Sequence, residues 1–589
     1  MSAPEEYDNV ELTLLNQNLV NICDEMAISM MRTAYSPIFS EGLDFSTLIL
    51  DSKGQLVATA GLNPAMLGAS LYAATWVIEE VGAENFQEGD MWIYNDPYRG
   101  GSHMPEHMII LPIYVDGKIA AYVGNIAHMA EIGGMAAGSF AATATDIYQE
   151  GLRLPPVKLF DRGEPVKDVW RIILTNHRTP VNSWGDLHAM LGSLYIGERR
   201  VRQLIEERGC ERISTNFSQL QDFAERHIRE EIRNLPNGVY CAEDCFDDDG
   251  IGPDPYYIRL TMTIDDDRVI FDYTDSDRQA QGSINAPYVV TLSASLNGLL
   301  YFLGRNLPVN AGITRAVRVV ARSGTISNVR HPGACVGGQT EYQPKLIEMI
   351  VSDILSRLEP ERASGGTGNT SLNFLFGGLH PDTHEYFAHY HFEGHGWGGR
   401  RSTDGNSAQI MLHANCRNTP VEIFETRYPW LHHQYALSQG TAGAGRTRGG
   451  LGVKRDIEVL GEMISVSVLA DRGERAPAGI LGGESGSMTE VLIKRTGSDV
   501  FETFVESEGS KSLTKFANVR LNRGDVVRLV SPSGGGYGSA FERDPDLVRE
   551  DVIDGFITSE QAKTQYGVAM TAEMQIDSTA TETLREGHR

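Results

Sequence analysis

Residues 95–134 begin with NDPYRGGSHMPEH and end with NIAHMAEIGG. Between these motifs lie two apolar runs, at 107–115 and 119–126, separated by Asp116 and Gly117. Apolar runs of this length joined by an Asp-Gly pair predict two strands of a β-hairpin. The motifs therefore fall at the ends of strands, where functional side chains often gather on a rigid scaffold.

The same stretch carries His103, Glu106 and His128 beside glycine-containing turns. Imidazole and carboxylate groups together are the usual protein ligands of Zn, Mn or Fe. Asp96, His107 and Glu131 lie near them in the sequence and are available to orient those ligands. The spacing predicts a divalent metal site, but His-x-x-Glu is a weak pattern, and histidines beside glycine turns also occur in surface loops.

Further elements are predicted on either side. Leucine, isoleucine and methionine recur every three or four residues between 9 and 34, which predicts an amphipathic helix. Residues 45–50 and 55–60 predict a second hairpin, and residues 91–95 another strand. Alternating apolar residues also predict a strand pair within 256–274, turned by three aspartates at 265–267.

The pattern along the chain predicts an α+β, multi-domain protein with β-rich mixed sheets, packed helices and a glycine-rich C-terminal β region. At 589 residues the chain is too long for one simple core. Four regions are expected. They are a metal-site region at 1–184, a helical and α+β region at 185–360, a glycine-rich β region at 361–544, and short helices with a flexible tail at 545–589.

The net charge of −27 disfavours binding to nucleic acid or to anionic membranes, because both carry the same sign of charge. No apolar run is long enough to span a bilayer, and the acidic start MSAPEEYDNVE does not resemble a secretion signal. The six cysteines are dispersed, which is typical of free thiols in a reducing compartment. A cytoplasmic protein is expected.

Two other motifs invite a functional interpretation. The run AGAGRTRGGLG at 442–452 lacks the Gly-Lys-Ser/Thr ending of a phosphate loop, so any ATP is expected to bind to another polypeptide. In YFAHYHFEGHGWGG, strand alternation would place His389, His391, Glu393 and His395 on one face. That face predicts either a second metal site, a substrate wall or an ordinary hydrogen-bonded polar strand.

The sequence resembles the hydantoinase B/oxoprolinase family over almost its whole length. Ten blocks carry the resemblance in order: FSEGLDFSTLILDSKGQLVA (39–58), NDPYRGGSHMPE (95–106), NIAHMAEIGG (125–134), QEGLRLPPVKL (149–159), GDLHAMLGSLYIGERR (185–200), GSINAPYVVT (282–291), RNTPVEIFETRYP (417–429), TAGAGRTRGGLG (441–452), DRGERAPAGILGGESG (471–486) and GGGYGSAFERDPDLVREDVIDGFIT (534–558).

The resemblance implies one half of a two-protein enzyme. A hydantoinase A-like ATPase partner, using ATP and Mg, would phosphorylate an amide or enolate oxygen, and the B-type subunit would complete the reaction at a divalent metal (Zn, Mn or Fe). It implies a cyclic amide (lactam, hydantoin or oxoproline-like) as substrate, or alternatively a ketone that is carboxylated. A heterotetramer or larger assembly is expected, because a released phosphorylated intermediate would hydrolyse.

The family pattern maps the metal ligands onto Asp44, His103, Glu106 and His128, with Glu41 or Glu131 as an accessory or general-base carboxylate. Glu106 and Glu131 stand where the family usually has aspartate, which is compatible with an enlarged metal site or with a degenerate, non-catalytic one. GGQTEYQPK at 337–345 departs from the family's Gly-Asn-x-Glu-Thr-Ser but keeps the acidic residue as Glu341. This difference leaves the substrate open.

Overall fold

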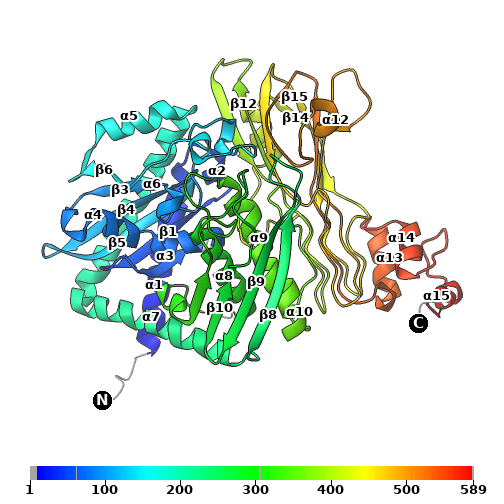
Figure 1. Cartoon of the computed structure of the whole chain (residues 1–589), viewed down its shortest axis with the longest axis horizontal. Coiled ribbons are helices and arrows are strands. Elements are labelled where there is room, and N and C mark those ends of the chain that lie inside the picture. The colour runs from blue at the N-terminus through cyan, green and yellow to red at the C-terminus, as the bar shows by residue number, and fades with distance from the viewer. Residues whose placement is uncertain (1–8, 61–62, 304–306, 587–589) are drawn as a thin grey trace.

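A computed structural model of the chain describes residues 9–60, 63–303 and 307–586. Its N-terminal part is built on a seven-stranded antiparallel sheet in the order β2-β1-β5-β4-β3-β6-β7 (Figure 1). The strands are β1 Phe45–Asp51, β2 Leu56–Ala60, β3 Met91–Tyr94, β4 Glu106–Val115, β5 Lys118–His128, β6 Val157–Asp161 and β7 Glu164–Pro165. Both predicted hairpins are confirmed, and Asp116 and Gly117 turn the second with positive φ.

Two long helices pack on this sheet, α1 Asn9–Thr33 and α6 Pro180–Arg208. The predicted apolar stripe of α1 is confirmed, since Leu15, Leu19 and Met26 are fully buried in the core they share with α6. The remaining helices of this part are α2 Pro37–Ser40, α3 Leu67–Tyr72, α4 Thr75–Val81 and α5 Lys167–Asn176. Together they bury the sheet and leave its strand ends to form a site.

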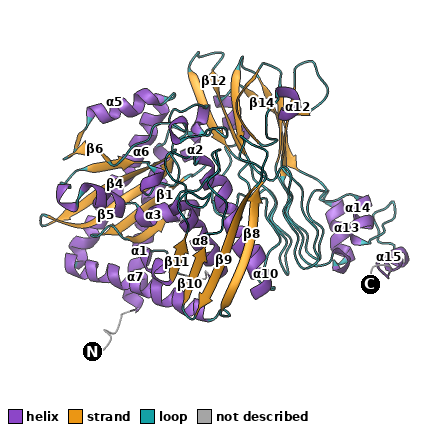
Figure 2. Ribbon diagram, viewed as in Figure 1, coloured by secondary structure: helices purple, strands orange, loops and turns teal. Residues whose placement is uncertain are grey.

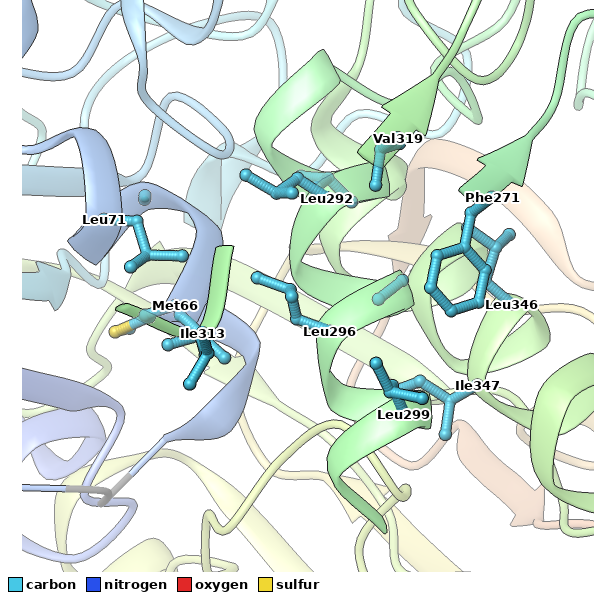
Figure 3. Packing of buried hydrophobic residues seen from close by; sticks show 14 of the residues in the cluster. Met66, Leu71, Phe271, Leu292, Leu296, Leu299, Ile313, Val319, Leu346 and Ile347 are labelled. Carbon is cyan, nitrogen blue, oxygen red and sulfur yellow. The ribbon is translucent and has the colours of Figure 1, made fainter. Parts of the chain in front are cut away.

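A second sheet, in the order β11-β10-β9-β8, follows in the middle of the chain. Its strands are β8 Gly238–Phe246, β9 Tyr256–Asp265, β10 Arg268–Asp272 and β11 Val317–Val320, and its helices are α7 Cys210–Arg233, α8 Tyr288–Leu303, α9 Gln343–Glu348 and α10 Leu355–Leu358. The apolar helix α8 joins the two sheets. Leu292, Leu296 and Leu299 reach α3 on one side and Leu346 and Ile347 of α9 on the other (Figure 3).

Two antiparallel sheets share a third apolar core in the C-terminal half. One has the order β13-β12-β16-β19, with β12 Asn373–Leu379, β13 Tyr386–His391, β16 Ile464–Leu469 and β19 Lys515–Leu521. The other has the order β14-β15-β20-β17-β18, with β14 Trp430–Leu437, β15 Val453–Val459, β17 Glu490–Lys494, β18 Glu502–Thr503 and β20 Val526–Val530. Helices α11 Val421–Arg427 and α12 Phe504–Glu508 complete this part.

The glycine-rich sequence forms an additional layer of extended segments that run side by side outside the strands (Figure 2). Backbone hydrogen bonds join them, for example from Gly399 N to Gly535 O at 2.9 Å and from Gly534 N to Gly450 O at 2.9 Å. A Cβ atom on Gly396 would lie 1.9 Å from Gly450 O. The glycines are therefore needed because neighbouring backbones touch.

The C-terminus is more ordered than the sequence suggests. The two short helices predicted at 545–569 are confirmed as α13 Pro545–Ile553 and α14 Ser559–Tyr566. The expected loose tail instead contains α15 Ser578–Glu586, because Thr581 accepts a hydrogen bond from Ala569 N and Arg585 donates to Arg543 O. Such contacts leave no periodic signal in the sequence. No helix among the described residues is long and apolar enough to cross a membrane.

The glycine layer gives a stability prediction. Gly396→Ala should lower the free energy of unfolding by about 1–3 kcal/mol or more, because its Cβ meets a backbone oxygen that cannot move freely. Gly192→Ala is the matched control: a Cβ there meets nothing within 4 Å in α6, and the change should stabilise by about 0.5–1 kcal/mol. Chemical unfolding of both variants tests this; equal effects would contradict the account.

Candidate metal centre

Three neighbouring strands bring candidate ligands to one end of the seven-stranded sheet. Asp44 directly precedes β1, Glu106 begins β4 and His128 ends β5. Glu106 pairs with His128 across the β4–β5 ladder, and His128 N donates to Asp44 O at 3.0 Å. Because the strands are antiparallel, the start of β1 and β4 and the end of β5 meet. His103 lies in the loop before β4, and its carbonyl accepts from Glu106 N at 3.1 Å.

The four predicted metal ligands line one buried pocket. His103 Nδ1 lies 3.6 Å from Glu106 Oε1, and His128 Nδ1 lies 3.7 Å from Asp44 Oδ2. These distances are too long for hydrogen bonds. They show that each imidazole lies beside a carboxylate, although the ring nitrogens left without a partner are the Nε2 atoms and not Nδ1. The imidazole rings of His103 and His128 lie 5.0 Å apart, centroid to centroid.

Burial sets the charge state of this pocket. Burial raises the pKa of Glu106 to about 8. Burial and the nearby charge of Glu106 raise the pKa of Asp44 to about 7. It lowers the pKa of His103 to about 3 and that of His128 well below its usual value. Near neutral pH both imidazoles are therefore neutral, and the carboxylates favour protons until a cation compensates their charge.

The donor set fits a divalent metal. The Nε2 atoms of His103 and His128 are buried without a hydrogen-bond partner, which is costly for polar atoms. In the described residues, however, no group of three or more His, Cys, Asp or Glu side chains is already arranged to hold a metal ion. Binding of one cation through the Nε2 atoms therefore requires the imidazoles and carboxylates to rearrange around it.

A surrounding set of polar contacts orients these side chains, as is usual around metal ligands. Asn63 Nδ2 donates to Asp44 Oδ1, and Ser102 Oγ donates to Glu106 Oε2. Gln339 Nε2 donates to Glu106 Oε1 at 3.1 Å. Gln339 and Glu106 are thus in direct contact.

An aromatic side chain packs against one imidazole. The Tyr390 ring stacks on His128 with a centroid distance of 4.7 Å and an interplanar angle of 19°, and its hydroxyl donates to Asn373 Oδ1 at 2.8 Å. Asn373 Nδ2 in turn donates to Glu341 Oε1 at 2.8 Å. Glu341 lies in a π-helical turn, Gly338–Tyr342, which also contributes Gln339 to the pocket. Irregular turns of this kind are often found at functional sites.

The two accessory carboxylates are placed elsewhere. Neither Glu131 nor Glu41 is among the described residues that line the pocket. Glu131 binds Arg178 Nη1 at 2.8 Å and accepts from Gly138 N at 2.8 Å, so it holds the following turn. Glu41 directly follows α2, and its carboxylate accepts from Ser40. An accessory or general-base role for either residue stays a prediction.

The second histidine cluster, around His389, His391 and Glu393, is best described by the third of its interpretations, a hydrogen-bonded polar strand. Tyr390 and Phe392 line the pocket, and the alternation of β13 directs His389 and His391 to the other face. There His391 Nε2 lies 3.1 Å from Glu393 Oε1, and Arg455 binds both oxygens of Glu393. An arginine already neutralises the carboxylate, so this network is poorly suited to a cation and fits a hydrogen-bonded polar strand. His395 lies apart, against Gly368.

Sequence reasoning missed the residues that support the site. Asn63, Gln339, Tyr390 and Cys416 reach the pocket from segments up to several hundred residues apart, so no local spacing links them. Only the altered GGQTEYQPK motif pointed to one of them. The six cysteines are free thiols, as expected.

Comparison with known proteins shows the family. The hydantoinase B/oxoprolinase family model matches residues 8–540, and the chain belongs to this family. The chain is 29% identical over 600 residues to the B-type subunit of a putative D-/L-hydantoinase of Pseudomonas sp. (strain NS671), covering 99% of this chain and 98% of that protein. It is 28% identical to the beta chain of the caprolactamase of Pseudomonas jessenii, covering 99% of each.

Comparison with solved structures finds the same fold. The crystal structure of the ATP-dependent caprolactamase from Pseudomonas jessenii matches with a TM-score of 0.90 and 27% identity, covering 99% of this chain and 100% of that chain. A nucleotide-free acetone carboxylase matches with a TM-score of 0.89 and 18% identity, covering 99% of this chain and 83% of that chain. The latter likeness shows the fold alone. The α+β, multi-sheet architecture is that of the family.

The Glu393 network gives a prediction about stability and pH. Burial alone would raise the pKa of Glu393, but Arg455 and His391 outweigh it and hold the pKa at about 2. Arg455→Met leaves a buried carboxylate without its cationic partner and should cost about 3–5 kcal/mol at pH 7. In that variant the Glu393 pKa rises above its unfolded value, so the deficit should shrink as the pH falls through the raised pKa.

Urea unfolding between pH 4 and pH 8 measures this dependence. The double variant Glu393→Gln/Arg455→Met is the control, because it buries no charge, and it should recover part of the lost stability. A deficit below about 1 kcal/mol, or one that does not change with pH, would show that the network is not held by this charge pair.

Proposed function

We propose that this chain is the metal-dependent B-type subunit of an ATP-dependent hydrolase that opens a cyclic amide, and that it completes hydrolysis of an intermediate phosphorylated by a hydantoinase A-like ATPase partner. The observation that supports it most is the pocket in which Asp44, His103, Glu106 and His128 meet. The ATP-dependent caprolactamase from Pseudomonas jessenii shares the fold over the whole chain at 27% identity.

In this proposal Asp44, His103, Glu106 and His128 hold a divalent Zn, Mn or Fe ion. When bound, such an ion supplies Lewis acidity and lowers the pKa of water to around 7. The chain's own residues prepare the site. Asn63 orients Asp44, Gln339 and Ser102 orient Glu106, and the Tyr390 ring fixes the plane of His128.

Loss of protons from Asp44 and Glu106 accompanies binding of the cation, because burial makes both carboxylates favour protons without it. An activated intermediate would hydrolyse if it were released into bulk water. Such an intermediate must pass directly from one subunit to the other. The proposal therefore includes a stable assembly with the ATPase partner, of heterotetramer size or larger.

Carboxylation of a ketone is the alternative reaction. Its support is the acetone carboxylase match, which at 18% identity extends to the fold and not to the chemistry. Cyclic amide hydrolysis is preferred because the hydantoinase and caprolactamase relatives are 28–29% identical over the full chain. A non-catalytic subunit with a degenerate metal site is the remaining alternative, and the metal content of the complex decides whether it holds.

Metal content is the first prediction of this proposal. The purified complex should contain about one Zn, Mn or Fe per chain by elemental mass spectrometry. His103→Ala should lose the metal and turnover together, whereas Gln339→Ala should weaken metal binding roughly 10–100-fold. His177→Ala removes a buried imidazole outside the pocket and should keep its metal. Turnover by a metal-free wild-type complex would contradict the assignment.

Dependence on bicarbonate separates the two reactions. The chain purified together with its ATPase partner should hydrolyse ATP when a cyclic amide is added, at the same rate with and without bicarbonate. A hydrolase needs only water as the second reactant, whereas a carboxylase needs a source of carbon dioxide. ATP turnover that requires both bicarbonate and a ketone would replace the hydrolase proposal with the carboxylase.

A further inference from the structure

Four of the residues that line the metal pocket carry a buried side-chain atom with no hydrogen-bond partner in the described part of the chain. These atoms are Nε2 of His103, Nε2 of His128, Nδ1 of His413 and Oε1 of Gln339. A buried polar atom without a partner is costly, and in native structures an ion or an ordered water usually explains it. Three of the four atoms are imidazole nitrogens, and the family motifs do not include His413.

A tight turn places His413 in the wall of the pocket. The bond from Ala414 N to Met411 O, 3.0 Å long, closes the turn around Leu412 and His413. His413 is buried, with 2% of its surface exposed. Burial and the neighbouring His395 lower the pKa of His413 to about 3, so the ring is neutral near pH 7. Neutral imidazole is the form that binds a metal.

Contacts from three other parts of the chain hold this turn and the residues on either side of it. They are a bond from Trp397 Nε1 to Ile410 O at 2.8 Å, a bond from the Tyr301 hydroxyl to Leu412 O, and a bond from Arg417 N to Gly42 O at 3.0 Å. The last bond ties the segment to the residues just before Asp44. His413 is therefore held beside the predicted ligands by contacts that do not involve a metal.

One water molecule does not satisfy these atoms. The free volume of the pocket is about 20 Å³, which has room for about one water. The Nδ1 atoms of His103 and His128 each face a carboxylate, at 3.6 Å and 3.7 Å, which favours a proton on Nδ1 and leaves a lone pair on Nε2. Together with Gln339 Oε1 these nitrogens make three acceptors, and a water has only two hydrogens to donate. A divalent cation instead accepts a lone pair from every ligand around it.

We infer that His413 is a third imidazole ligand of the metal, beside His103 and His128. The inference rests on the proposed function, because it takes from that proposal that the pocket holds a divalent metal. It adds a nitrogen ligand from outside the family motifs to the two histidines and the carboxylates. It also makes the metal a link between the seven-stranded sheet and the C-terminal half of the chain.

X-ray absorption spectroscopy of the full chain loaded with Zn²⁺ counts the imidazole ligands directly. Zn²⁺ is the probe because nitrogen and oxygen sites bind it more tightly than Mn²⁺ or Fe²⁺. Scattering from the imidazole rings should fit three histidines in the wild type and two in His413→Ala. The wild-type count needs no substitution, so it tests the inference even if a variant fails to fold.

Titration of the metal-free chain with Zn²⁺ against a competing chelator measures the affinity. Binding to His413→Ala should be weaker by about 100-fold or more, because loss of even a residue that only supports a ligand costs roughly 10–100-fold. Added free imidazole should restore part of the affinity of this variant, since it can occupy the space of the missing ring. A residue that only packs against the site would not be replaced in this way.

His395→Ala is the matched control. His395 is also fully buried, has ring nitrogens without a partner among the described residues, and is not one of the described residues that line the pocket. This variant should keep three imidazole ligands and the affinity of the wild type. Melting curves confirm that both variants are folded.

Two results overturn the inference and leave the proposed function in place. One is a metal-bound wild type with only two imidazole ligands. The other is an equal loss of Zn²⁺ affinity in His413→Ala and His395→Ala, which would show an effect of packing. A wild-type chain that binds no Zn²⁺ overturns the proposed function, and the inference with it.

Discussion

The pairing of β1, β5 and β4 is the constraint on which the candidate site depends. Antiparallel order places the beginning of β1, the end of β5 and the beginning of β4 at the same end of the sheet. Ladder hydrogen bonds and the bond from His128 N to Asp44 O fix the backbones of three ligands. A shift of one residue in this register would turn the side chains to opposite faces and separate the carboxylates from the imidazoles.

The electrostatic cost of this arrangement is the reason to expect a cation. Two carboxylates and two neutral imidazoles are buried together, and their nearest polar contacts come from the neutral groups of Asn63, Ser102 and Gln339. The contrast with the Glu393 network is informative. There Arg455 supplies the positive charge within the chain, and the pKa of Glu393 falls. Among the described residues that line the pocket there is no arginine or lysine, and the carboxylate pKa values rise.

Much of the local structure could be predicted from the sequence. The spacing of apolar residues and the residues typical of turns predicted α1, the β1–β2 and β4–β5 hairpins, and the helices α13 and α14. Family motifs pointed to the four candidate ligands, and the structure places all four around one pocket. Alternation in β13 was correctly expected to group His389 and His391, but it could not say which face meets the pocket. That depends on Tyr390 packing against His128, a contact between residues 262 positions apart.

The remaining features depend on long-range packing. The glycine-rich sequence predicts β-strands. In the structure its extended segments lie in backbone-to-backbone contact, because glycine has no side chain to keep them apart. α15 forms because distant residues accept and donate its hydrogen bonds. A second cavity, which Asn63 also lines, is built from α1, α3, α8, the β1–β2 hairpin and residues 307–309, which come together only after folding.

Anomalous X-ray scattering from crystals of the active complex tests the central claim most directly, with data collected at the absorption edge of the metal found by elemental analysis. The account predicts one anomalous peak in this chain, within about 2–2.3 Å of His103, His128 and at least one carboxylate of Asp44 and Glu106. An active complex with no peak in that pocket, or with its only peak elsewhere, would contradict the assignment.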